Sequence, residues 1–228
     1  MKRRGISLLE VMVASFVMSI VVYGAYQIFR EGAQYFRTNQ RAVDAQNSAL
    51  IFLNKMTLEA VSAREDLIES YAAPYPGLVF ASPVGQDGKI HYGADSRIIW
   101  KRFICYYYDA TERKVYRKEE AVPGSTLLPG GGGSVNGDSS PTTVASAMGS
   151  RDTNYFASTA GLDARIVASD VESLTISDYD PTAGILPGTS TATTAKRAFD
   201  VALEVGNPND TGPTGYYLLL RSRVGARG

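Results

Sequence analysis

The chain begins with MKRRGISLLEVMVASFVMSIVVYGAYQIF, residues 1–29, and its clearest pattern lies in this segment. A basic cluster, residues 2–4, precedes nineteen residues, Val11–Phe29, that carry no charge. As a helix these residues span about 28 Å, close to the thickness of a bilayer's hydrocarbon core. Buried helices of soluble proteins rarely stay uncharged on every face for so long, and no small-residue cleavage site ends the run as in a secretory signal. We therefore predict a transmembrane helix over residues 6–29.

One acid interrupts the apolar pattern. Glu10 lies at the edge of the membrane segment, where an ionised carboxylate is costly unless it is paired. Neighbouring positions on the same helix offer no cation. If the chain were cut after Gly5, the new amine of Ile6 would be a cation at the same depth. A neighbouring subunit, shifted along its axis, could offer this amine to Glu10, which is therefore our candidate assembly residue.

The segment KRRGISLLEVMVA, residues 2–14, resembles the class III signal of type IV prepilins and type II secretion pseudopilins. The shared pattern is a glycine before the cut, a serine two residues past it and a glutamate five residues past it. The resemblance implies that residues 1–5 are a leader, that a prepilin peptidase cleaves between Gly5 and Ile6, and that it methylates the Ile6 amine. Ile6 departs from the commoner phenylalanine. The helix would act first as a membrane anchor and later in a filament core.

Residues 30–70 predict an amphipathic helical stem, because residues 31–70 contain no proline and only one glycine. With the membrane segment, the helix would run to about Glu69, a length of roughly 96 Å. Its end is indicated by the sequence APYPG, residues 73–77. We expect its apolar stripe to cover the head. The stripe residues, at helical spacing, are Phe36, Val43, Leu50, Leu53, Val61 and Ile68.

Residues 71–228 predict a β-rich head, so the fold class is α+β and pilin-like: a long N-terminal helix packed on a C-terminal antiparallel sheet. In one strand Ile104, Tyr106 and Tyr108 should share a face, and Cys105 is interpreted as a small buried residue. Glycine, serine, threonine and proline content predicts flexible loops over 123–150 and 181–195. The expected strands are 78–82, 97–108, 114–118, 167–179, 199–205 and 216–224.

The order of stem, aromatic strand, hairpin return and closing strand is similar to that of W-type minor pilins and J-type pseudopilins. This implies a structural and assembly subunit, at or near the tip of a type IV pilus or type II secretion pseudopilus. Its partners would be prepilin peptidase and other pilin or pseudopilin subunits. The basic cluster predicts a single pass through the bacterial inner membrane with Met1 cytoplasmic and the head exported. A single-pass envelope protein with an enzymatic head, or one that binds DNA or mediates adhesion, is the alternative.

Composition argues against a nucleic-acid partner. The 23 basic and 23 acidic residues sum to zero, and loss of the three leader cations leaves 20 against 23, a balance of −3. Two local basic clusters are interpreted as solvated strand edges. They are Arg97, Lys101 and Arg102, and Arg221, Arg223 and Arg227.

Catalytic and metal chemistry find little support in the sequence. One cysteine and one histidine, His91, allow neither an intramolecular disulfide nor a thiolate zinc cluster, so we expect no enzyme and no cofactor. Asp178 and Asp180 are weak calcium candidates beside a second oxygen-rich group, residues 207–210. Their spacing does not match a twelve-residue calcium loop, and turn formation is the better interpretation.

Overall fold

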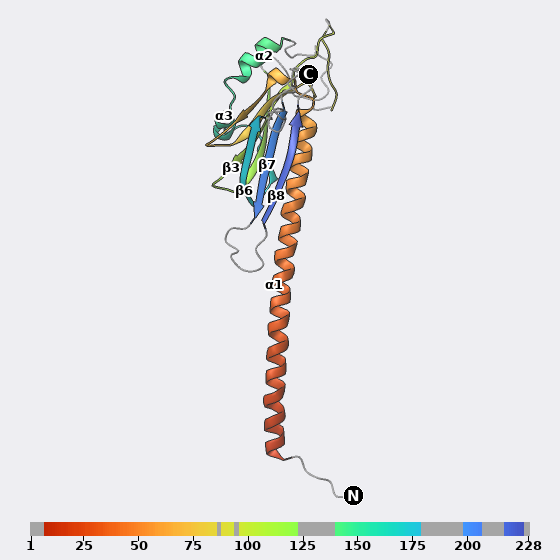
Figure 1. Cartoon of the computed structure of the whole chain (residues 1–228), viewed down its shortest axis with the longest axis vertical. Coiled ribbons are helices and arrows are strands. Elements are labelled where there is room, and N and C mark those ends of the chain that lie inside the picture. The colour runs from red at the N-terminus through yellow and green to blue at the C-terminus, as the bar shows by residue number, and fades with distance from the viewer. Residues whose placement is uncertain are drawn as a thin grey trace, which may run out of the picture.

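A computed structural model describes residues 7–85, 88–93, 96–122, 140–178, 198–206 and 217–225. It joins one very long helix to a two-sheet head (Figure 1). The elements in chain order are α1 (Leu8–Ala60), η1 (Glu65–Leu67), β1 (Ile68–Tyr71), β2 (Gly77–Ser82), β3 (Arg102–Asp109), β4 (Lys114–Ala121), α2 (Pro141–Met148), α3 (Thr153–Ser158), β5 (Arg165–Ala168), β6 (Val171–Asp178), β7 (Ala198–Gly206) and β8 (Tyr217–Gly225). The predicted α+β, pilin-like architecture is confirmed.

Helix α1 has 53 residues and is about 80 Å long. Its first buried residue is Ala45, so the head covers only the C-terminal part. Figure 1 shows the rest of α1 projecting well beyond the head as a bare rod. An 18-residue window of this helix has a mean hydropathy of 2.0 and is 0% buried, which makes it long and apolar enough to cross a membrane.

The head contains two antiparallel sheets where the sequence predicted one. The larger has the order β1-β2-β3-β4-β5 and the smaller the order β6-β7-β8. The strand expected over 167–179 is divided between them, because Asp170 takes a left-handed conformation (φ 56°) that turns the chain from β5 to β6. Backbone amides hold this turn: Val171 donates to Arg113 and Gly206 donates to Asp170.

Side chains from β3 and from the turn after it join the two sheets. Arg113 donates to the Glu172 carboxylate and, at 2.7 Å, to the Gly206 carbonyl. The Tyr108 hydroxyl donates to the carbonyls of Val171 at 3.1 Å and Glu172 at 2.7 Å. Each bond joins the larger sheet to the smaller one, so the head folds as one unit.

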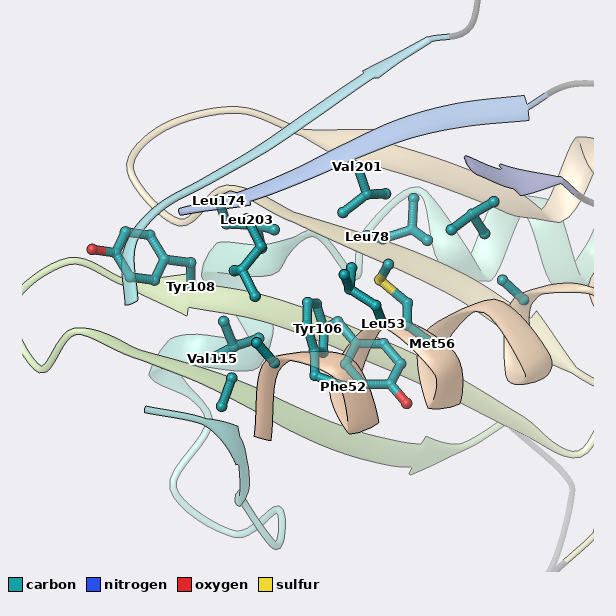
Figure 2. Packing of buried hydrophobic residues seen from close by; sticks show 14 of the residues in the cluster. Phe52, Leu53, Met56, Leu78, Tyr106, Tyr108, Val115, Leu174, Val201 and Leu203 are labelled. Carbon is teal, nitrogen blue, oxygen red and sulfur yellow. The ribbon is translucent and has the colours of Figure 1, made fainter. Parts of the chain in front are cut away.

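Both faces of the larger sheet are buried, and β3 contributes to each. Ile104, Tyr106 and Tyr108 share the face that packs against α1 and the smaller sheet, as predicted (Figure 2). Cys105 belongs to the opposite face, in a second core with residues of α2 and α3. The expectation that Cys105 is buried is confirmed, and burial raises the pKa of its thiol well above the usual value.

The predicted apolar stripe of the stem is wrong at most of its positions, although Leu53 is buried against the head as expected. Phe36, Val43, Leu50 and Val61 are exposed, with 69%, 53%, 41% and 41% of their surfaces accessible. A different face of α1, rich in alanine, meets the head, because small side chains let the helix approach β5 and β8 closely. The buried residues of this face are Ala45, Ala49, Phe52, Leu53, Met56 and Ala60.

The stem helix also ends earlier than predicted, at Ala60 instead of residue 70. There the Ser62 hydroxyl donates to the Glu59 carbonyl at 2.6 Å, which satisfies a carbonyl of the last turn. Ile68 is fully buried and, in β1, pairs with Phe80 of β2. Strand pairing and burial therefore override helical propensity here, and the proline-rich residues 73–76 connect β1 to β2.

The loop predicted over 123–150 is wrong in its last part. Residues 141–148 form α2, which begins with a proline in its first turn and buries Val144 and Met148 against the larger sheet. Composition misses this helix because its only large apolar side chains in the core are those of Val144 and Met148, and Ala145 and Ala147 add small contacts. Residues 123–139 and the loop predicted over 181–195 lie outside the described residues.

Replacement of Gly77 by alanine should destabilise the head. A Cβ there would lie 2.2 Å from the Tyr106 carbonyl oxygen and 2.8 Å from Thr153 Cγ2. Overpacking against the backbone should lower the free energy of unfolding by about 3 kcal/mol. Urea unfolding of the purified chain in detergent, followed by fluorescence of the buried Trp100, measures this effect. Gly161→Ala is the control, because no atom lies within 4 Å of its Cβ position, and equal stability losses would contradict the packing argument.

Candidate assembly site

Glu10 lies in the first turn of α1 and forms a capping box with Ser7. The Ser7 amide donates to Glu10 Oε2 at 3.0 Å, and the Leu9 amide donates to Ser7 Oγ at 3.3 Å. These bonds satisfy backbone donors that have no partner within a helix, and a negative charge is favourable at this helix end. The serine, two intervening residues and glutamate are the sequence signature of such a box, so Ser7 could have been identified beforehand.

The contact with Ser7 leaves Glu10 able to bind a further donor, since a carboxylate accepts about four hydrogen bonds. Around it, Leu8, Leu9, Val11 and Met12 are all exposed. Thus one carboxylate stands on a helix whose apolar surface the protein's own head does not cover. Such a surface is suited to lipid or to the helices of other subunits. The cleavage residues Gly5 and Ile6 lie outside the described residues.

Among the described residues, the other candidate site residues do not come together in one site. Asp178 is exposed at the end of β6, and Asp180 lies outside the described residues. In the part of the chain that the structure describes, no group of three or more His, Cys, Asp or Glu residues could hold a metal ion. His91 is half-buried in the segment between β2 and β3.

Some residues of the two basic clusters are buried or paired within the head. In the first, Lys101 is buried and Arg102 donates to Glu119 at 2.8 Å. In the second, Arg223 pairs with Asp200 at 3.0 Å, and Arg227 lies outside the described residues. Arg102 and Arg223 are therefore engaged in ion pairs within the head.

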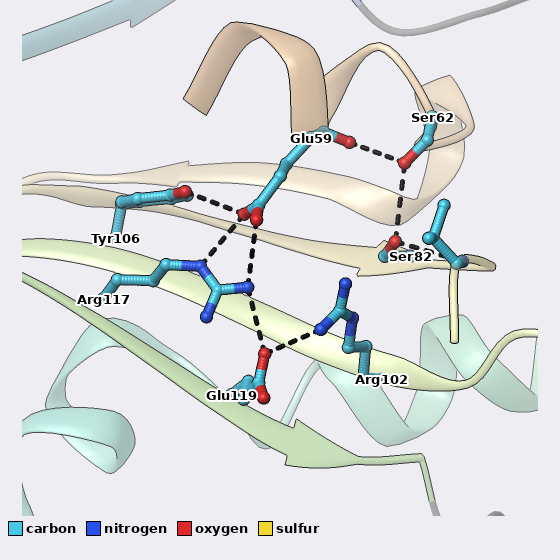
Figure 3. A network of polar contacts seen from close by, with 8 residues as sticks. Glu59, Ser62, Ser82, Arg102, Tyr106, Arg117 and Glu119 are labelled. Atoms are coloured by element: carbon cyan, nitrogen blue, oxygen red, sulfur yellow. Dashed lines mark hydrogen bonds and ion pairs between the residues drawn. The ribbon is translucent and has the colours of Figure 1, made fainter. Parts of the chain in front are cut away.

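A polar network that the sequence did not reveal joins the last turn of α1 to the larger sheet (Figure 3). Glu59 accepts from Arg117 Nε at 3.0 Å, from Arg117 Nη2 at 3.1 Å and from the Tyr106 hydroxyl at 2.7 Å. Glu119 lies between Arg117, at 3.0 Å, and Arg102, at 2.8 Å. Two acids and two guanidinium groups thus alternate from helix to sheet.

The charges of this network are mutually supporting. Burial opposes the charge of Arg117, but its bonds to Glu59 outweigh burial and raise its pKa. Burial likewise opposes ionisation of Glu119, yet Arg117 and Arg102 lower the pKa of that carboxyl. Burial and the neighbouring Glu59 charge raise the pKa of Tyr106, which therefore remains a donor. The network fixes the direction in which α1 leaves the head.

Comparison with known protein families gives a match on the segment that carries Glu10. The family described as the prokaryotic N-terminal methylation motif matches residues 1–26. The chain carries a pilin-type, class III signal. This signal implies processing by prepilin peptidase and assembly with other pilin-type subunits, and with its apolar helix it marks a membrane-anchored protein. No curated protein and no solved structure matches the chain.

Loss of the Arg117 charge should loosen α1 from the head. The Arg117→Met variant keeps a side chain of similar aliphatic length but leaves Glu59 without its ion pair. We expect a loss of about 3 kcal/mol in unfolding free energy. Urea unfolding with Trp100 fluorescence tests this. Arg223→Met is the matched control, because that exposed pair should be worth less than about 1 kcal/mol. Similar losses in both variants would contradict a special role for the network.

Proposed function

We propose that this protein is a minor pilin or pseudopilin, a structural and assembly subunit of a type IV pilus or type II secretion pseudopilus. It is processed after Gly5 and enters the filament through α1, at or near the tip. The observation that carries the proposal is the exposed N-terminal part of α1, which has Glu10 in its first turn and is covered by the head only from Ala45 onward. A helix of this kind is complete only when lipid or other helices surround it.

The arrangement suits a chain that stands upright in a membrane. Met1 is cytoplasmic in the proposed orientation, and the head is exported. Between Phe29, the end of the uncharged run, and Ala45, the first residue under the head, the helix rises about 24 Å. This spacer holds the head clear of the bilayer surface while α1 packs among its neighbours.

Glu10 supplies the register of assembly in this proposal. After cleavage, the Ile6 amine of an adjacent subunit donates to the Glu10 carboxylate, which already holds its own Ser7 amide. An unpaired charge within a bilayer costs about 3 kcal/mol, so a subunit at the wrong height is disfavoured. The capping box keeps the carboxylate at the start of the helix, where the amine of a shifted neighbour arrives.

The head serves assembly in this proposal and has no catalytic role. Cys105 is buried with a raised thiol pKa, which makes it a poor nucleophile. Glu59, Glu119 and Arg113 are each engaged in an ion pair within the head. These ties favour a rigid body whose outer surface, rather than an internal site, meets partners.

Mass spectrometry of the protein purified from membranes tests the proposed processing. The mature chain should begin at Ile6 and carry one added methyl group on its amine. A Gly5→Leu variant should keep Met1 and migrate more slowly as the uncut precursor. If the wild-type chain itself begins at Met1, the protein is instead a single-pass anchored envelope protein whose head acts outside any filament.

The Glu10→Gln variant isolates the charge from the cap. Glutamine at this position preserves a capping box, so the helix start is retained. Without the negative charge, the amount of protein in sheared filaments, relative to the membrane pool, should fall about tenfold, while cleavage after Gly5 shows that insertion is normal. Quantitative immunoblotting of the two fractions gives this ratio. Incorporation at the wild-type level would refute the Glu10–Ile6 pairing.

A further inference from the structure

The face of α1 that points away from the head has an ordered pattern of its own. From Phe36 to Asn54, apolar and amide side chains alternate along this face at spacings of four and three residues, and Val61, the C-cap of α1, follows seven residues later. We call this set the outer seam. Its residues are Phe36, Gln40, Val43, Asn47, Leu50, Asn54 and Val61. All of them are exposed.

The outer seam lies opposite the head-facing stripe. Successive helical residues turn by about 100°, so Asn47 and Asn54 lie about 140–180° around the axis from Phe52, Met56 and Ala45, which face the head. A second helix could therefore lie along the outer seam without meeting the head. In Figure 1 the head stands to one side of α1, and the other side of the helix is uncovered.

The spacing is that of a coiled coil. The a positions of a heptad are then occupied by Gln40, Asn47, Asn54 and Val61. The d positions are occupied by the apolar residues Phe36, Val43 and Leu50, followed by Thr57. A polar residue at a specifies a two-stranded, aligned arrangement and lowers its stability. Three amides in successive a positions thus encode a pair that is selective and weak.

Charge is absent from the outer seam and gathers on one flank of the same helix. No outer seam residue is ionisable, so two identical seams can meet without repulsion. Each amide has both donor and acceptor groups and can bond to its own counterpart. The charged residues of the flank are Arg37, Arg41, Asp44 and Lys55.

We propose that the outer seam pairs with the outer seam of a second copy of this chain, in parallel and in register, while both are anchored in the membrane. The same N-terminal segment anchors both copies, so their helices run in one direction and start at one depth. Gln40, Asn47 and Asn54 then face their own counterparts. The uncharged run Val11–Phe29 continues the paired surface below the seam.

The pair rests on the proposed membrane anchoring, but not on filament incorporation. It should therefore persist in the Glu10→Gln variant even where that variant leaves the filament. If the outer seams did not pair but the protein still entered the filament, only the proposed pair would be overturned. If the protein did not enter the filament but the seams still paired, the proposed pair would stand.

Single-cysteine cross-linking in native membranes tests the pair with the full chain. Asn47→Cys and Asn54→Cys place thiols on the outer seam, and the adjacent Ser48→Cys and Lys55→Cys place them off it. Mild oxidation should yield a product of twice the chain mass at least tenfold more from the seam positions than from their neighbours. The wild-type chain, with only the buried Cys105, is the blank.

Two outcomes would overturn the proposal. Equal yields from seam and neighbouring positions would show contact without a defined face. A seam product of another mass would identify a different subunit as the occupant. In the Leu50→Cys background, Asn47→Asp should also reduce the yield of cross-linked dimer about tenfold, because it brings two negative charges together at one level. Ser48→Asp, off the outer seam, should leave the yield unchanged. Equal effects of the two substitutions would likewise contradict the proposal.

Discussion

The alanine-rich face of α1 is the contact on which the head depends. Ala45, Ala49 and Ala60 present little more than backbone, so β5 and β8 can approach the helix from two sheets. Phe52 and Met56 fill the space between them. Neither sheet could bury its inner face without this helix, because a small domain needs a second layer to exclude water. The larger sheet is closed on its other side by α2 and α3, and three layers result.

The polar tie at the end of α1 solves an electrostatic problem that the helix itself creates. The last turn contains Glu59 and no basic residue, although negative charge is disfavoured at a helix C-terminus. Arg117 of β4 brings the missing positive charge, and Glu119 and Arg102 extend the alternation. At the opposite end Glu10 lies where the helix favours an acid. The two glutamates therefore differ in what they need: Glu59 requires the head, whereas Glu10 can hold a further partner.

Much of this architecture could be predicted from the sequence, for reasons that lie in particular residues. The uncharged run after Glu10 identified the membrane segment, and two-residue alternation placed Ile104, Tyr106 and Tyr108 on one face of β3. The prediction of the stem's apolar stripe failed at most positions because large apolar side chains indicate an apolar face but not the partner that covers it. The head selected alanines, which periodicity of large residues cannot reveal.

The sequence likewise revealed some of the functionally relevant residues and not others. Glu10 was visible because its charge stands alone in an apolar run, and the capping serine is part of a local signature. The Glu59–Arg117 tie joins residues 58 positions apart, and each looks like an ordinary solvated charge in its own segment. Helix α2 was missed because its composition is that of a loop and its only large apolar side chains in the core are those of Val144 and Met148. Local patterns therefore identified the membrane end of the molecule better than its head.

The two proposed arrangements of α1 exclude each other for any given pair of helices. In the membrane pair both helices start at one depth, so Asn47 faces Asn47 and each Glu10 lies level with its counterpart. For Glu10 to meet the Ile6 amine, one helix must shift along its axis by four residues, about 6 Å. This shift brings Asn47 of one helix to the level of Val43 or of Ile51 of the other, according to its direction. The amides thus favour the aligned pair, and the Glu10 charge favours the shifted neighbour. Because amides at a make the aligned pair weak, the charge can draw a processed subunit out of it.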